Sequence, residues 1–242
     1  MKEMIRRYLR QKFGSIGIVI ALAVFVLMGA SQAAATGQAE SLESGGFFAL
    51  LVLAAASVAK DASSGALQMI LARPILRVEY LFGRYCGILL AYAAYLAATA
   101  GAALLLSPLL GRLFGADNAG KLPPGELVRS AAGSLLSSAL FAAVLLFFST
   151  FLRGYGDVLA YFLLSLLLAA PGALSEPLKM PWLSKLGSIA RDNILPRVSW
   201  NEVLRGKGIL APATGAFVLA VIAYLTFAAW IFSRREFTYG QD

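Results

Sequence analysis

Few side chains in this sequence could carry out chemistry. The 242 residues include no histidine and a single cysteine, Cys86. Histidine is the commonest general base and the commonest neutral metal ligand, so both roles lack their usual residue. A lone cysteine can form neither an internal disulfide nor a Cys-x-x-Cys metal site. Because Cys86 falls within an apolar run, we expect an inert, buried thiol.

Catalytic and nucleotide-binding motifs are missing as well. The sequence contains no G-x-S-x-G, no pair of carboxylates within an apolar run, and no G-x-x-x-x-G-K-[ST] loop. Neither a serine–histidine pair nor a two-aspartate site can be built from these residues. The loop that cradles ATP phosphates is absent too. We therefore expect a chain that is not itself an enzyme and that binds no metal or cofactor.

The composition favours lipid as the solvent. Apolar residues make up 59% of the chain and charged residues only 14%, against about a quarter charged in soluble domains. The net charge of +8 comes from Lys and Arg at the edges of the apolar runs, where they meet anionic headgroups. No basic and aromatic stripe typical of nucleic-acid binding is present. Membrane lipid is thus an expected partner, and nucleic acid is not.

The apolar runs predict an all-α integral membrane protein with six transmembrane helices. A crossing needs about 20 mostly apolar residues. One transmembrane domain, 1–242, is expected, with crossings at 14–35, 45–61, 84–110, 130–152, 158–174 and 210–232.

Charge at the flanks predicts the orientation. The segment before the first crossing carries five cations, whereas the loop at 36–44 carries none and has Glu40 and Glu43. By the positive-inside rule both termini are cytoplasmic, with Arg234 and Arg235 at the C-terminal end. The segment 175–209 is also basic and runs against this rule, because the same topology places it outside.

Two amphipathic segments flank the crossings. Met4, Ile5, Tyr8 and Phe13 recur at helical spacing, which predicts an interfacial elbow helix at the N-terminus. The outer segment 175–209 holds tryptophans at positions 182 and 200, which predicts short helices at the outer interface.

The loop between the second and third crossings is the most informative. It reads KDASSGALQMILARPILRVEYLFGR over 60–84. Leu67, Ile70 and Leu71 share one helical face, and the helix is expected to end before Pro74. The segment 62–83 therefore predicts an apolar knob on the cytoplasmic side that fits a socket on a soluble partner.

This loop resembles that of type-2 ABC transporter permeases. The shared pattern is Asp61-x-x-x-Gly65-x-Leu67-x-x-x-Leu71-x-x-Pro74-Ile75-x-Arg77-x-x-Tyr80-x-x-Gly83-Arg84. The sequence departs from the family pattern where Ser63 and Ser64 replace acidic residues and Gln68 replaces glutamate. The basic N-terminal helix, the six crossings and the closing Arg234-Arg235-Glu236 are similar to the family layout.

The resemblance implies a permease subunit, in a prokaryotic plasma (inner) membrane, of an ATP-driven exporter. Its coupling helix would dock on a separate ATPase subunit, in two copies, which binds ATP and Mg; a second permease copy or a paralogue would complete the transporter. The resemblance assigns the docking contact to Asp61, Gly65, Leu67, Ile70, Leu71, Arg73, Pro74 and Arg77.

Two tyrosines are candidates for lining a transport pathway. Tyr92 and Tyr95 lie three residues apart and so share one face of the third crossing, although helix packing explains the spacing equally well. Gly83-x-x-x-Gly87 at the start of that crossing offers a surface for close helix packing. The spans hold no central Asp or Glu, which disfavours an ion-coupled pathway.

Three other classes of protein remain as alternatives. The first is a secondary transporter or channel that works without an ATPase, which is disfavoured by the missing mid-membrane charges and by the lack of a visible inverted repeat. The second is an intramembrane enzyme, which lacks its catalytic residues. The third is a structural membrane subunit that transports nothing.

Overall fold

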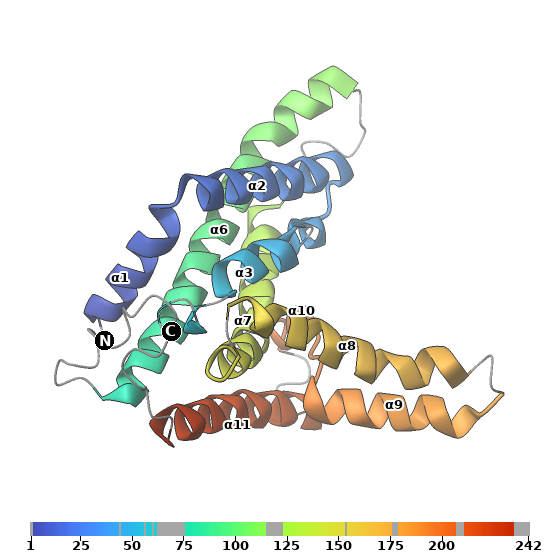
Figure 1. Ribbon diagram of the computed structural model, residues 1–242. Helices are drawn as coiled ribbons and strands as arrows, with labels where there is room; N and C mark the ends of the chain where they lie inside the picture. The colour runs from blue at the N-terminus through green and yellow to red at the C-terminus, as the bar shows by residue number, and fades with distance from the viewer. Residues whose placement is uncertain are drawn as a thin grey trace. The chain divides into compact units, whose positions relative to one another are not determined.

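The computed structural model describes nine stretches of the chain. These are 2–43, 45–55, 57–59, 61, 76–114, 123–152, 154–175, 179–206 and 211–234. Within them the regular secondary structure is entirely helical (Figure 1). The all-α prediction is confirmed for these residues.

Five described helices are long and apolar enough to cross a membrane. They are α2 (Ile16–Thr36), α6 (Arg77–Phe114), α7 (Pro124–Ser149), α8 (Gly156–Ser175) and α11 (Pro212–Arg234). Each overlaps a predicted crossing. α6 begins seven residues earlier than expected, at Arg77 instead of residue 84, and α7 begins six residues earlier, at Pro124 instead of residue 130. The chain is therefore a multi-pass membrane protein by the length and composition of its helices.

The expected second crossing at 45–61 differs from its prediction. The structure has a 3-10 helix, η1 (Ala39–Glu43), and then a nine-residue α-helix, α3 (Gly46–Ala54). Turns follow at Ala55 and at 57–58. At 1.5 Å per residue α3 is about 14 Å long, roughly half of the hydrocarbon core. Hydropathy did not reveal this break, because the residues at 55–59 are still apolar except for Ser57.

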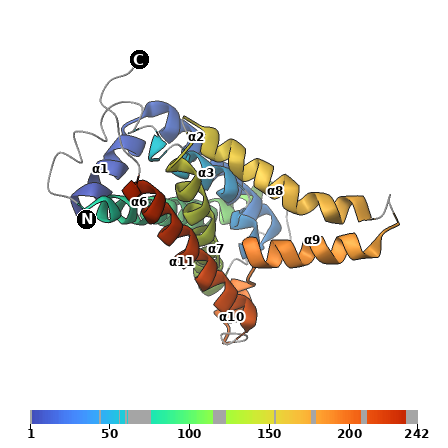
Figure 2. The same cartoon turned by 60° about the horizontal axis from the view of Figure 1, so that its bottom comes forward.

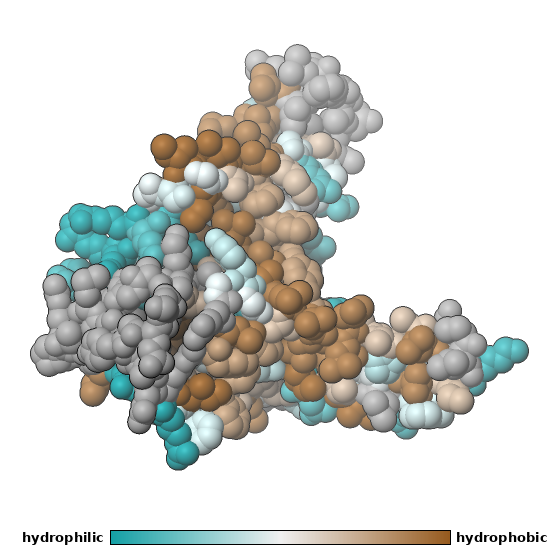
Figure 3. All heavy atoms as spheres, in the orientation of Figure 1, coloured by the Kyte–Doolittle hydropathy of each residue, from teal (hydrophilic) through white to brown (hydrophobic). Residues whose placement is uncertain are grey.

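The remaining helices are short. The predicted N-terminal helix is present as α1 (Lys2–Phe13), and the segment 175–209 holds α9 (Pro181–Ile194) and α10 (Trp200–Val203). Figure 3 shows hydrophilic side chains on α1 and hydrophobic ones on α2, as expected for a helix outside the lipid core followed by one inside it.

The chain divides into two compact units. Unit 1 comprises Met1–Ala54, Gly83–Ala139 and Ser199–Lys207, and unit 2 comprises Ala55–Phe82, Leu140–Val198 and Gly208–Asp242. Helices α6 and α7 each have residues in both units.

In unit 1, α2 and α6 run in the same direction. Arg84 donates a hydrogen bond to Gln11, just before α2, and Tyr95 donates one to the carbonyl of Phe25. Further along, Ala30 and Ala33 share a buried cluster with Ala103. Since the contacts advance together along both helices, the chain must turn back between Gly37 and the start of α6.

The η1–α3 segment makes that return. Ala39 belongs to the same buried cluster as Ala103, whereas a Cβ on Gly46 would lie 2.7 Å from the Tyr92 hydroxyl. At the other end of α3, Lys12 and Tyr8 donate hydrogen bonds to the carbonyls of Val52 and Leu53. The segment thus runs back beside α6 from the level of residue 103 to that of α1.

Packing of α1 on α6 depends on Gly87. A Cβ there would lie 2.7 Å from the Tyr8 ring, so only glycine lets the fully buried ring approach. The Arg84 guanidinium lies 5.3 Å from the centre of the same ring, a cation–π contact. Burial raises the pKa of the Tyr8 hydroxyl above its usual value, an effect that Arg84 partly offsets. The hydroxyl therefore stays protonated and keeps donating to Leu53.

In unit 2, α8 and α9 form an antiparallel pair (Figures 1 and 2). Gly187 of α9 has no side chain, and a Cβ there would lie 3.1 Å from Pro171 of α8. Aromatic contacts join the other helices of this unit: Phe141 meets Tyr161 and Phe147 meets Tyr224, edge to face. Short helices in the segment 175–209 were predicted, but the packing of α9 along α8 was not.

Candidate functional site

Two of the eight predicted docking residues are described by the structure, and both lie in unit 2. Gly65, Leu67, Ile70, Leu71, Arg73 and Pro74 fall within 62–75, outside the described residues. Asp61 and Arg77 lie at the two ends of this stretch. Each of these two residues contacts a long helix.

Asp61 is attached to α6. Its side chain is only 3% exposed, and the Tyr80 hydroxyl donates a hydrogen bond to its Oδ2 over 2.8 Å. Tyr80 is itself fully buried, and its ring stacks on Phe232 with 5.7 Å between the ring centres. A carboxylate can be buried at acceptable cost only when it is hydrogen-bonded or paired. The hydrogen bond from Tyr80 therefore holds the buried Asp61 side chain against α6.

Arg77, the first residue of α6, is attached to α11. Its Nη1 donates to the carbonyls of Phe232 and Ser233, over 3.3 and 2.8 Å. These carbonyls belong to the last turn of α11, whose backbone acceptors lack partners within the helix. A cation at this end is also favoured by the helix dipole.

Ser149, the last residue of α7, holds the turn before Asp61. Its Oγ accepts hydrogen bonds from the backbone N–H groups of Val58 and Ala59, each over 3.1 Å. The turn that ends α3 frees these N–H groups, and Ser149 satisfies them. We call Asp61, Arg77, Tyr80, Ser149 and Phe232 the anchor cluster.

The sequence did not predict the anchor cluster. Asp61 and Arg77 were expected to contact an ATPase, and the structure gives each of them partners within the chain. Tyr80 appeared only as part of the motif, and Ser149 and Phe232 were not singled out. Helical spacing could have linked Arg77 to Tyr80, which lies three residues on, but nothing in the sequence pairs either residue with α11.

Tyr92 and Tyr95 pack the core of unit 1. Their rings stack with 5.7 Å between centres, and both side chains are buried. The Tyr95 hydroxyl donates to the carbonyl of Phe25 over 3.3 Å, and Gly46 leaves room for the Tyr92 hydroxyl. These contacts join α6 to α2 and α3, so the structure shows the packing role, and the pathway role stays a prediction.

An apolar cavity of about 470 Å³ lies beside Tyr95, between α2 and α6. Apart from the Tyr95 hydroxyl, its lining has no polar side chain. The lining residues are Phe13, Val19, Leu22, Ala23, Val26, Leu27, Ala94, Tyr95 and Ala98. Such a surface suits a hydrocarbon chain.

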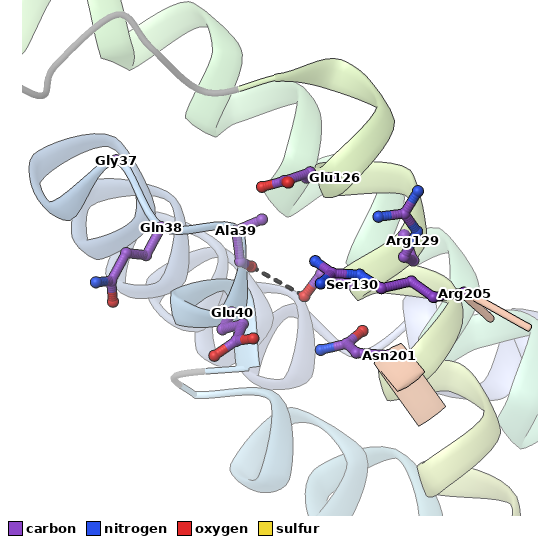
Figure 4. A pocket seen from close by; sticks show the side chains of 9 residues that line it. All are labelled: Gly37, Gln38, Ala39, Glu40, Glu126, Arg129, Ser130, Asn201 and Arg205. Carbon is purple, nitrogen blue, oxygen red and sulfur yellow. Dashed lines mark hydrogen bonds between the residues drawn. The ribbon is translucent and has the colours of Figure 1, made fainter. Parts of the chain in front are cut away.

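A second cavity in unit 1, of about 290 Å³, is polar (Figure 4). We call it the polar pocket. It forms where α2 ends, α7 begins and α10 packs beside them. The lining residues are Gly37, Gln38, Ala39, Glu40, Glu126, Arg129, Ser130, Asn201 and Arg205.

Local geometry builds the polar pocket. Gly37 ends α2 with a φ of +68°, which glycine adopts without strain and which turns the chain into η1. Ser130, nearly fully buried, donates a hydrogen bond to the carbonyl of Ala39 over 3.0 Å and so joins α7 to η1. On α7, a Cβ at Gly133 would lie 3.0 Å from Asn201 Oδ1, so α10 packs closely there because that residue is glycine.

The polar pocket brings together three segments that the sequence predicted to share one side of the membrane. They are the loop after the first crossing, the start of the fourth and the segment 175–209. The sequence analysis used Glu40 only to orient the chain and did not identify the pocket. Its residues are far apart in the sequence, so no spacing reveals them.

Among the described residues, no group of three or more His, Cys, Asp and Glu side chains could hold a metal ion. No protein-family model matches the chain, and no curated protein is significantly similar to it.

Proposed function

We propose that this chain is the permease subunit of an ATP-driven transporter, and that segment 62–75 docks on a separate ATPase subunit. The observation that carries the proposal is the anchor cluster. Asp61 ties one end of the segment to α6, and Arg77 ties the other end to α11. Ser149 ties the preceding turn to α7. A displacement of the segment would therefore act on three membrane helices through direct hydrogen bonds.

Six crossings follow if η1 and α3 together form the second one. The parallel course of α2 and α6 supports this reading, because the chain has to return between them. A broken crossing is tolerated in a membrane where its non-helical backbone is buried in protein. With six crossings both termini lie on the same side, which the basic residues of α1 favour as cytoplasmic.

The rest of the proposal follows the resemblance of the loop at 60–84. The transporter would be an exporter in a prokaryotic inner membrane. It would contain two ATPase subunits, which bind ATP and Mg, and a second permease copy or a paralogue. The apolar cavity beside Tyr95 adds a surface suited to a hydrophobic cargo.

Co-purification with the ATPase encoded by a neighbouring gene tests the proposal. Replacing both Leu67 and Leu71 by Asp places charges in a dry interface, which costs several kcal/mol. We expect the affinity for the ATPase to fall roughly a thousandfold and the stimulation of ATP hydrolysis to disappear.

A matched control separates docking from general damage. Met180 and Leu204 are exposed apolar residues of the outer segment, 43% and 41% accessible, and the Met180→Asp/Leu204→Asp variant should bind the ATPase normally. Docking that survives Leu67→Asp/Leu71→Asp would contradict the assigned interface. Transport by the purified chain without any ATPase would instead identify a secondary transporter.

A further inference from the structure

We propose that the polar pocket binds the zwitterionic headgroup of phosphatidylethanolamine, with the phosphate at Arg129 and Arg205 and the ammonium group at Glu40 and Glu126. This site requires only that the helices span a membrane. It is independent of the proposed docking on an ATPase.

The charges of the polar pocket point to a ligand that carries both signs. Two carboxylates and two guanidinium groups line one cavity of about 290 Å³. None of these four groups forms an ion pair with any residue that the structure describes. In Figure 4 the guanidinium of Arg205 extends towards Ser130, while Glu40 and Glu126 lie to either side of it. The four charges sum to zero, so a zwitterion fits better than a simple anion or cation.

The chemistry of each group fits one half of the headgroup. A guanidinium binds phosphate oxygens through a planar pair of N–H donors. A primary ammonium carries three N–H donors, which suit carboxylate oxygens. The amide of Asn201 adds a donor and an acceptor at the wall of the pocket. The quaternary ammonium of choline has no N–H, so phosphatidylcholine should bind more weakly.

The position of the polar pocket favours a lipid over a soluble zwitterion. The pocket lies at the C-terminal end of α2 and the N-terminal end of α7, two membrane-crossing helices, and the ends of such helices meet the headgroup region. Val128, between the lining residues Glu126 and Arg129, is 71% exposed. Apolar surface for acyl chains therefore adjoins the charged groups.

Binding of labelled lipid to the purified protein in detergent tests the proposal. Spin-labelled phosphatidylethanolamine should bind more tightly than the matching phosphatidylcholine or phosphatidylglycerol. Arg205→Gln and Glu40→Gln should each weaken binding about tenfold, since each removes one charge-assisted contact. The Glu40→Gln/Glu126→Gln variant, which leaves two cations, should instead prefer phosphatidylglycerol.

Controls of the same chemistry lie outside the polar pocket. Lys185 and Asp192 are exposed on α9, and Lys185→Gln and Asp192→Asn should leave lipid binding unchanged. Equal binding by the wild type and all pocket variants, or a wild-type preference for phosphatidylglycerol, would overturn the proposal. So would equally tight binding of water-soluble glycerophosphoethanolamine, which would make the ligand a free zwitterion. A loss of the folded peak in size-exclusion chromatography would remove that variant from the series, and its Lys-for-Arg or Asp-for-Glu counterpart would replace it.

Discussion

Single residues of the anchor cluster form polar contacts within an apolar fold. Asp61 is nearly fully buried beside Tyr80, in a chain whose spans otherwise carry few charges. A buried carboxylate is stable only with donors around it, and Tyr80 supplies one. Arg77 is held in place as well, because its Nη1 donates hydrogen bonds to two carbonyls of α11.

Tyr80→Phe tests the anchor at the level of one hydrogen bond. The substitution removes a donor from the buried carboxylate of Asp61 and preserves the ring that stacks on Phe232. We expect a loss of about 1–3 kcal/mol in the free energy of unfolding, measured by denaturant titration in detergent. Tyr155→Phe is the control, since Tyr155 is 70% exposed in the turn before α8, and it should change little. Equal stability of the two variants would mean that the Tyr80 bond contributes nothing.

At the scale of elements, glycines allow particular helices to pack closely. The Gly83-x-x-x-Gly87 pattern was expected to support close packing, and Gly87 does so against the ring of Tyr8. Gly46 has the corresponding role between α3 and Tyr92. Because these helices of unit 1 pack closely at glycines, a methyl group added at Gly46 or Gly87 should lower the stability of the fold.

Gly87→Ala should displace α1 from α6. The new methyl group would overlap the Tyr8 ring, whose hydroxyl is held by Leu53. We expect a loss of roughly 1–3 kcal/mol in stability and faster tryptic cleavage within α1, measured by limited proteolysis. Gly101 lies on the same helix with no atom within 4 Å of its would-be Cβ. Gly101→Ala should therefore be neutral or slightly stabilising, and identical digestion of both variants would refute the contact.

At the scale of the whole molecule, two helices connect the proposed activities. The anchor cluster belongs to unit 2 and the polar pocket to unit 1, and α6 and α7 continue from one unit into the other. α6 has 38 residues, about 57 Å at 1.5 Å per residue, which exceeds the roughly 30 Å hydrocarbon core.

Cysteine labelling tests the six-crossing topology. After Cys86, which is only partly buried, is replaced by Ser, single cysteines are introduced at Ser63, Tyr155 and Met180, the last of which is 43% exposed between α8 and α9. A membrane-impermeant maleimide added to intact cells should label position 180, and positions 63 and 155 should react only after permeabilisation. Labelling of position 63 in intact cells would show that the η1–α3 segment does not cross, and it would place segment 62–75 outside.

Much of the fold could be predicted because hydropathy reports the lipid environment directly. A crossing helix needs a long run without charge, and five such runs reappear as α2, α6, α7, α8 and α11. The amphipathic spacing of Met4 and Tyr8 likewise predicted α1, in which both are buried. The expected second crossing at 45–61 was the exception, because an apolar run does not show whether a segment stays helical.

The sequence by itself predicted that the long helices lie in lipid, that the fold is helical, and where most of the long helices begin and end. These properties depend on local composition over about 20 residues. The sequence also singled out the segment 60–84, whose docking role stays a prediction. Only the tertiary structure decided what holds Asp61 and Arg77, how η1 and α3 return beside α6, and that Glu40, Arg129 and Arg205 share a pocket. Those contacts join residues tens of positions apart, and their geometry depends on how whole helices pack, which no local pattern records.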